Sequence, residues 1–68
     1  MAWNEESRAS MKQRREALGW SRAELARRAV MNSSTVGSIE NGRMITPYPV
    51  QRRKILKALA AGEAEKVS

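Results

Sequence analysis

Most of the side chains in this sequence that could act on another molecule are basic. The 68 residues include 13 Lys and Arg against 7 acidic residues, all of them Glu, and the formal net charge is +6. Cysteine, histidine and aspartate are absent, so disulfides, thiolate or imidazole metal ligands and histidine acid-base catalysis lack their groups. We therefore expect no metal, no cofactor and no catalysis, and a polyanion as partner.

Nucleic acid and an anionic membrane surface are the two polyanions to weigh. No apolar run is long enough to span a bilayer, and no secretory signal pattern is present. The basic residues are spread along the chain and do not form one long amphipathic stripe, which argues against a helix lying on a membrane. We expect a soluble cytoplasmic protein with no membrane contact and no small-molecule ligand.

The elements that must position these groups are short helices with recognisable ends. Asn4 can cap a first helix, which Gly19 closes with a left-handed residue. Ser21 and Glu24 have the spacing of a capping box, so a second helix starts there and runs to about Ala29.

A third helix follows after a very short connection. Asn32 can cap this helix, and Asn41 with Gly42 ends it. Only Val30 and Met31 are free to turn the chain between the second and third helices. The two helices must therefore meet at a steep angle, as in a helix-turn-helix.

The remaining third of the chain is predicted to be a loop and a last helix. The stretch from Arg43 to Pro49 holds both prolines and is predicted to be a loop. Apolar residues then mark a helix that ends near Gly62. We expect an all-α fold of four helices, with room for a fifth, in one compact domain over residues 1–62, followed by a polar tail over 63–68.

One charge of each sign falls on an apolar stripe. Arg15 lies at helical spacing between Met11 and Leu18, and Glu40 directly follows Ile39 on the third helix. Long charged side chains in such places often reach back to water. We favour a partly buried pair between Arg15 and Glu40 that locks the first helix to the third, because both charges occupy stripe positions.

The run LGWSRAELARRAVMNSSTVGSIENG, from Leu18 to Gly42, resembles the Cro and phage-repressor (XRE) type of helix-turn-helix domain, and the likeness extends over residues 11 to 61. The resemblance implies a lambda-repressor-like fold whose third helix, Ser33 to Asn41, enters the major groove of double-stranded DNA. It implies a small transcriptional regulator, of repressor type, acting in a bacterial cell or a phage-infected host. It also implies that Arg15 and Glu40 form a structural ion pair.

This chain departs from that family at two places. The turn of the family usually carries Gly in a left-handed conformation, where this chain has Val30, for which positive φ is strained. The base-reading positions often hold Gln, Asn, Arg or Lys in the family, whereas in this chain they hold the small residues Ser33, Ser34, Gly37 and Ser38. A serine hydroxyl cannot make the bidentate contacts that single out guanine or adenine.

The residues that the resemblance assigns to DNA lie on and beside the third helix. Arg22 opens the second helix and can reach a phosphate or fork onto a guanine. Asn32 and Asn41 have an alternative role as helix caps. The candidate DNA-binding residues are Arg22, Asn32, Ser33, Ser34, Thr35, Gly37, Ser38, Asn41 and Arg43.

A second copy of the chain is the other expected partner. The resemblance places subunit contacts near the proline-braced loop, where Met44, Ile45 and Tyr48 are the candidate dimer residues. The homodimer can be weak enough to form only on DNA, because a small patch does not repay the cost of association alone. The alternative is that these residues fold back onto the chain's own core.

The serine-rich third helix leaves one competing function open. A helix-turn-helix module can instead bind another protein, as an antitoxin or an accessory regulator does. The strength and salt dependence of binding to duplex DNA separates the two functions.

Overall fold

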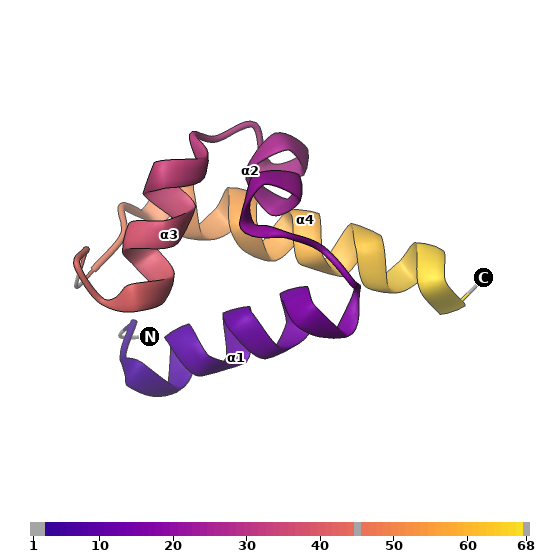
Figure 1. Ribbon diagram of the computed structural model, residues 1–68, viewed down its shortest axis with the longest axis horizontal. Coiled ribbons are helices and arrows are strands. Elements are labelled where there is room, and N and C mark those ends of the chain that lie inside the picture. The colour runs from indigo at the N-terminus through magenta and orange to yellow at the C-terminus, as the bar shows by residue number, and fades with distance from the viewer. Residues whose placement is uncertain (1–2, 45, 68) are drawn as a thin grey trace.

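The computed structural model describes residues 3–44 and 46–67, the last of these by its backbone alone. This part of the chain forms four helices and no strand, so the predicted all-α fold is confirmed. In chain order the helices are α1 (Glu5–Ala17), α2 (Arg22–Ala29), α3 (Ser33–Asn41) and α4 (Pro49–Val67). They pack against one another (Figure 1), and the principal-axis extents are 34 × 22 × 19 Å.

The starts of the first two helices lie where the capping residues predicted them. The Asn4 side chain accepts a hydrogen bond from the Ser7 amide at 2.9 Å, and the Ser7 hydroxyl accepts one from the Asn4 amide, which completes a capping box. Ser21 accepts from the Glu24 amide at 3.0 Å. The Glu24 carboxylate, however, binds the two arginines of the following turn instead of the Ser21 amide, so the predicted box is only half formed.

The ends of α1 and α2 share one hydrogen-bonding pattern but not one residue type. Gly19 follows α1 with φ 73°, and the next amide, of Trp20, donates to a carbonyl five residues back. Val30 follows α2 with φ 56° and ψ 55°, and the Met31 amide donates to the Ala26 carbonyl at 2.8 Å. Both ends are Schellman motifs, in which the left-handed residue is usually glycine. The turn between α2 and α3 thus has the left-handed geometry that glycine usually adopts, although the residue there is a valine.

Replacing Val30 by glycine is expected to raise the free energy of unfolding by about 1 kcal/mol. The valine is 77% exposed, so little buried contact is lost, and the strain of a β-branched residue at positive φ is removed. Urea titration followed by circular dichroism measures the change. Val30→Ala is the control, since it keeps the Cβ that makes positive φ costly. A Val30→Gly protein no more stable than Val30→Ala would show that the turn is unstrained.

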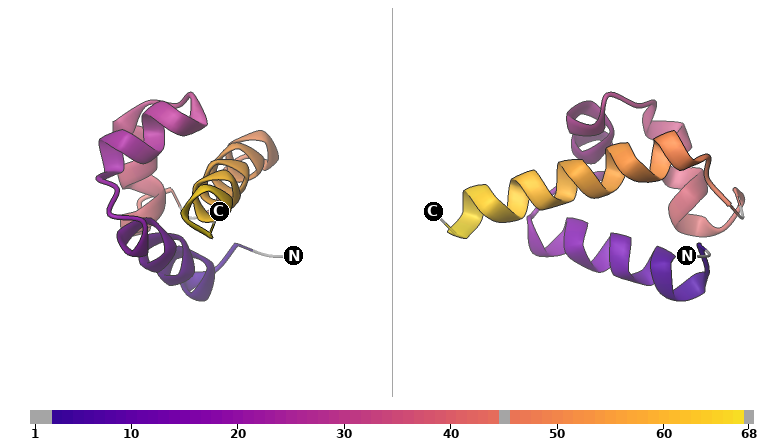
Figure 2. Two further views of the ribbon diagram at one scale, coloured as in Figure 1. Left: turned by 90° about the vertical axis from the view of Figure 1, so that its right-hand side faces the viewer. Right: turned by 180° about the vertical axis from the view of Figure 1, so that it is seen from behind.

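The four helices form two layers around one core. Figure 2 shows α1, α2 and α3 on one side and α4 laid across them on the other, and α4 contacts both α1 and α2. The side chains sealed between the layers come from all four helices. The largest helical ones are Met11, Leu25, Val36, Ile39, Ile55 and Leu59, each at most 1% exposed.

The last helix is longer than the sequence predicted. We expected it to end near Gly62, but α4 runs on to Val67. Gly62 serves packing and not termination: a Cβ at this position would lie 2.4 Å from two ring atoms of Trp20. The glycine therefore makes room for the indole, which lies against the middle of the helix.

Polar contacts to α1 hold the final turns of α4 in place. Arg14 donates to both carboxylate oxygens of Glu63, at 2.6 and 2.8 Å, and Lys66 donates to the Ala17 carbonyl at 2.7 Å. Residues 63–67 thus continue the helix and touch the rest of the fold. The boundary between a 1–62 domain and a 63–68 tail stays a prediction.

The segment between α3 and α4 is anchored at its far end. Pro47 is fully buried, and α4 begins two residues later at Pro49, whose missing amide is no loss at the first position of a helix. The Tyr48 amide donates to the Gln51 side chain at 2.9 Å, so the start of α4 is capped.

Candidate nucleic-acid interface

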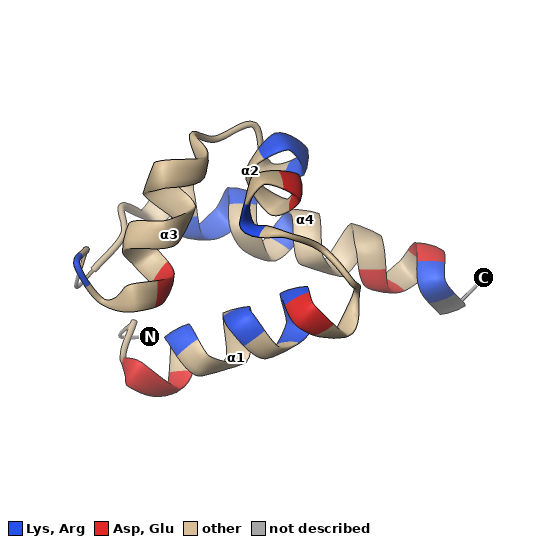
Figure 3. Ribbon diagram, viewed as in Figure 1, with Lys and Arg blue, Asp and Glu red and all other residues tan. Residues whose placement is uncertain are grey.

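The outward face of α3 is small and polar. Val36 and Ile39 are fully buried, and they fix the opposite face toward solvent. Glu40 is the only charged residue on this helix, which is otherwise tan in Figure 3, and its side chain is 1% exposed. Along the outer face Ser33, Ser34 and Asn41 are exposed, while Thr35, Gly37 and Ser38 are half-buried. The backbone of α3 can therefore come close to a partner, but the helix presents no cation of its own.

The two asparagines at the ends of α3 act as caps. The Asn32 side-chain oxygen accepts from the Ser34 amide and hydroxyl, at 3.4 and 3.0 Å. The Asn41 side-chain oxygen accepts from the Arg43 amide at 3.0 Å. Because both oxygens are used within the protein, each asparagine has only its amide N–H groups to offer a phosphate or a base. The Ser34 hydroxyl donates to Asn32, so toward a partner it can act as an acceptor.

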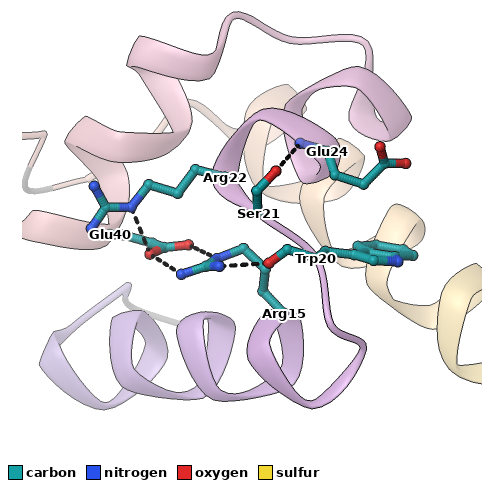
Figure 4. Close-up of polar contacts among 6 residues, drawn as sticks. All are labelled: Arg15, Trp20, Ser21, Arg22, Glu24 and Glu40. Carbon is teal, nitrogen blue, oxygen red and sulfur yellow. Dashed lines mark hydrogen bonds and ion pairs between the residues drawn. The ribbon is translucent and has the colours of Figure 1, made fainter.

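A buried ion pair fixes α3 against α1. Arg15 donates from Nε to Glu40 Oε2 at 2.6 Å and from Nη2 to Oε1 at 3.1 Å (Figure 4). The side chains of Arg15 and Glu40 are 9% and 1% exposed. The structure thus brings together the two residues that the stripe pattern paired. A third bond, from Arg15 Nη1 to the Trp20 carbonyl at 2.7 Å, extends the link to the start of α2.

The surroundings of the Arg15 guanidinium favour its charged form. Its hydrogen bonds to Glu40 raise the pKa of Arg15 above its ordinary value and outweigh the opposing effect of burial. The bidentate geometry, shown in Figure 4, is the strongest form of such a pair. The position of α3 relative to α1 therefore rests on a permanent ionic contact.

Arg22 uses the same carboxylate from the other side. Its Nε donates to Glu40 Oε1 at 3.3 Å, and its side chain is 50% exposed (Figure 4). A Cβ placed on Gly37 would lie 4.0 Å from both Cδ and Nη1 of Arg22, so this side chain runs alongside α3. The sequence pattern paired Glu40 with Arg15 alone and did not indicate this second partner.

Arg8 is a second cation beside α3 that the sequence interpretation missed. Its guanidinium lies near Gly42, where a Cβ would be 3.5 to 3.8 Å from three of its atoms. A cation is favoured there, at the carboxyl end of a helix. Its position was available as a signal: Arg8 precedes Arg15 by seven residues, which is two helical turns on the same face.

The predicted partner residues in the loop have different environments. Arg43 is exposed directly after α3. Met44 is partly buried against the core, which leaves less of its side chain for a second subunit, whereas Tyr48 is 69% exposed. Ile45 lies outside the described residues.

Other kinds of site are not found in the described residues. Over 3–44 and 46–67, no three acidic, His or Cys side chains lie close enough to hold a metal ion. In the same part of the chain, no helix combines the length and apolar character that crossing a membrane requires.

Comparison with known proteins assigns the chain to a family. The match is to the helix-turn-helix domain and covers residues 8–67. Comparisons with curated proteins and with solved structures gave no match. The matched region takes in all of α2 and α3 together with the turn at Val30. Domains of this kind are typically DNA-binding and non-enzymatic, which agrees with a basic chain that presents a small, polar helix face. The chain therefore belongs to the helix-turn-helix domain family.

Proposed function

We propose that this chain is a sequence-specific, double-stranded DNA-binding regulator of the Cro and phage-repressor type, and that it represses transcription without catalysis. The observation that carries the proposal is the placement of α3. A buried carboxylate bound by Arg15 holds its inner side, its outer side carries only short polar side chains, and arginines lie beside its middle and at its carboxyl end. That arrangement suits a helix that enters the major groove between two phosphate backbones.

The residues around α3 are of two kinds: short side chains that can contact base edges, and long basic side chains that can contact phosphates. Ser33, Ser34, Thr35 and Ser38 can make single or water-mediated contacts to base edges, and the Thr35 methyl can meet a thymine. The exposed Arg43 is placed for a phosphate on one side, and Arg8 adds a cation near the same end of α3. The amide groups of Asn32 and Asn41 can add donors at either end. Phosphate contacts of this kind set register and supply much of the affinity.

A salt series on duplex DNA tests this proposal. We expect log K to fall linearly with log salt, and Arg43→Ala to flatten the slope by about 1, because one phosphate contact is lost. Fluorescence anisotropy with duplexes selected from a random pool gives both quantities. Lys57→Ala is the matched control, because Lys57 is an exposed cation on α4, the helix of the opposite layer (Figure 2). Equal slopes in parent and Arg43→Ala remove Arg43 from the interface, and no salt-dependent binding to any duplex ends the proposal.

The same selected duplexes decide the oligomeric state. We propose that two protomers bind a near-palindromic site through contacts around Tyr48, a residue that is 69% exposed directly before α4. Half-sites about 34 Å apart, one turn of DNA, are the expected geometry. Sedimentation of the complex gives the number of protomers. One protomer on a site without two-fold symmetry would make this chain a monomeric reader.

A protein-binding module, such as an antitoxin or accessory regulator, is the second candidate function. The feature that favours it is the absence of any Lys or Arg on α3 itself. In that case duplex binding is weak at every sequence, and selection from a random pool enriches no motif. An enriched motif rules this candidate out.

A further inference from the structure

We infer that Arg22, although it belongs to α2, is the residue that reads a guanine for this domain. The inference rests on the proposed function and adds to it a specificity-determining residue and the base that it recognises. The argument begins with what α3 lacks. Reading guanine requires two donors aimed at O6 and N7 together, and arginine is the residue that does this most often. The outer face of α3 offers hydroxyls, amides and a glycine.

Arg22 is held where such a fork is needed. Its Nε is bound to Glu40 Oε1 at 3.3 Å, and Glu40 is itself fixed by the bidentate contact with Arg15. Tying Nε back to a buried carboxylate leaves the terminal nitrogens, Nη1 and Nη2, as the end of the side chain that can meet a partner. These two nitrogens form a planar pair of donors that matches the two acceptors of guanine.

Arg22 passes close to Gly37. The position that a Cβ would take on Gly37 lies 4.0 Å from Arg22 Cδ and Nη1, an ordinary contact distance. The aliphatic stem of Arg22 therefore runs along α3, the helix that the proposed function places in the groove. Figure 4 shows the stem of Arg22 lying between the two helices with its guanidinium above Glu40. A guanidinium kept beside the reading helix is better placed for a base edge than for a flanking phosphate.

The hydrogen bond from Arg22 to Glu40 also lowers the entropy that the Arg22 side chain loses when it binds DNA. Half of the Arg22 side chain is exposed, and a free arginine in that position would lose much rotamer freedom on binding DNA. The bond to Glu40 has already fixed part of the side chain before DNA arrives. Arg27, on the same helix, is 70% exposed and pairs only with Glu24 at the surface among the described residues. Arg27 therefore serves as the matched control.

The test compares charge-conserving variants on a duplex selected with the parent protein. Each guanine of that duplex is replaced in turn by 7-deazaguanine, which loses the N7 acceptor but keeps its base pairing. At one guanine of the half-site we expect the parent to bind about tenfold more weakly. Arg22→Lys keeps the charge but cannot form the fork, so the same replacement should change its affinity less than about twofold. Arg27→Lys should keep the full tenfold effect.

The outcomes separate this inference from the function on which it rests. Arg22→Lys should bind a random duplex as the parent does, with the same salt slope, since its charge is unchanged. That measurement also shows that the variant is folded. If the parent is insensitive to 7-deazaguanine everywhere, or if Arg22→Lys keeps the full penalty, Arg22 does not read guanine although the protein is still a DNA-binding regulator. If neither protein binds any duplex, both the inference and the proposed function are wrong.

Discussion

Replacing Glu40 by alanine is expected to lower the free energy of unfolding by about 3 to 5 kcal/mol. The carboxylate is 1% exposed and accepts from Arg15 and from Arg22. Its removal leaves the guanidinium of Arg15, itself 9% exposed, in the interior without its anion. An unpaired buried charge is much more costly than the lost attraction alone. Urea titration followed by circular dichroism gives the free energy of unfolding for parent and variant.

The control for this prediction is an ion pair of the same kind at the surface. Arg14 and Glu63 also meet in a bidentate contact, but their side chains are 33% and 41% exposed. Glu63→Ala should therefore lower the free energy of unfolding much less than Glu40→Ala does, because solvent screens this pair. Equal effects of Glu40→Ala and Glu63→Ala would mean that burial does not set the strength of the Arg15 contact.

A double variant keeps the prediction decisive even if Glu40→Ala unfolds the chain. A domain of 68 residues has roughly 3 to 10 kcal/mol of stability in total. Arg15→Met combined with Glu40→Leu removes both buried charges and replaces them by apolar groups of similar size. Such replacements recover much of the loss when burial of an unpaired charge is the cause. A double variant as unstable as Glu40→Ala would point instead to the shape of the contact.

The helix starts and the Arg15–Glu40 contact could be predicted because each depends on nearby residues or on helical period. Asn4, Ser21 and Asn32 cap the helix that follows them, and a cap acts over only three residues. The pair between Arg15 and Glu40 followed from stripe positions, which point at the same core whatever the exact crossing of the helices. The capping box at Ser21 could also be proposed from local spacing. That only half of it forms could not, because two arginines compete for the Glu24 carboxylate.

Contacts that depend on how two helices cross could not be predicted in this way. That Arg22 reaches Glu40 and runs past Gly37 follows from the angle between α2 and α3, which the left-handed turn at Val30 sets. The sequence does indicate that Arg8 shares a helix face with Arg15. Its neighbour Gly42, however, becomes known only when the loop after α3 is placed.

The predicted end of α4 near Gly62 is wrong because it too depends on a contact between distant parts of the chain. A glycine near the end of a helix is commonly a terminator, and the local pattern predicts that role for Gly62. In the fold it is the place where the Trp20 indole meets α4. Trp20 comes from the connection between α1 and α2, 42 residues earlier in the chain, and no local pattern links the two positions.

That contact leads to a second large effect on stability. Gly62→Ala should lower the free energy of unfolding by about 1 to 3 kcal/mol, because the new methyl would lie 2.4 Å from two ring atoms of Trp20 and 3.1 Å from a methyl of Leu18. The sign is opposite to the usual result, since glycine to alanine inside a helix ordinarily gains up to about 1 kcal/mol. Arg28 lies 4.4 Å from the centroid of the ring, and the bond from Arg15 to the Trp20 carbonyl holds the backbone of this residue. It is therefore not free to move aside without disturbing the start of α2.

Gly37→Ala provides the matched control on α3. Gly37 is also inside a helix, but a Cβ there would meet nothing closer than 4.0 Å, so this variant should show the ordinary gain in thermal stability. Trp20→Phe, which removes the two ring atoms that clash, should make Gly62→Ala almost harmless in the combined variant. The measurement is the unfolding midpoint, by circular dichroism, of the parent, the three single variants and the combined variant. If Gly62→Ala is as stable as Gly37→Ala, the indole does not pack on Gly62, and α4 is held to the start of α2 by other contacts.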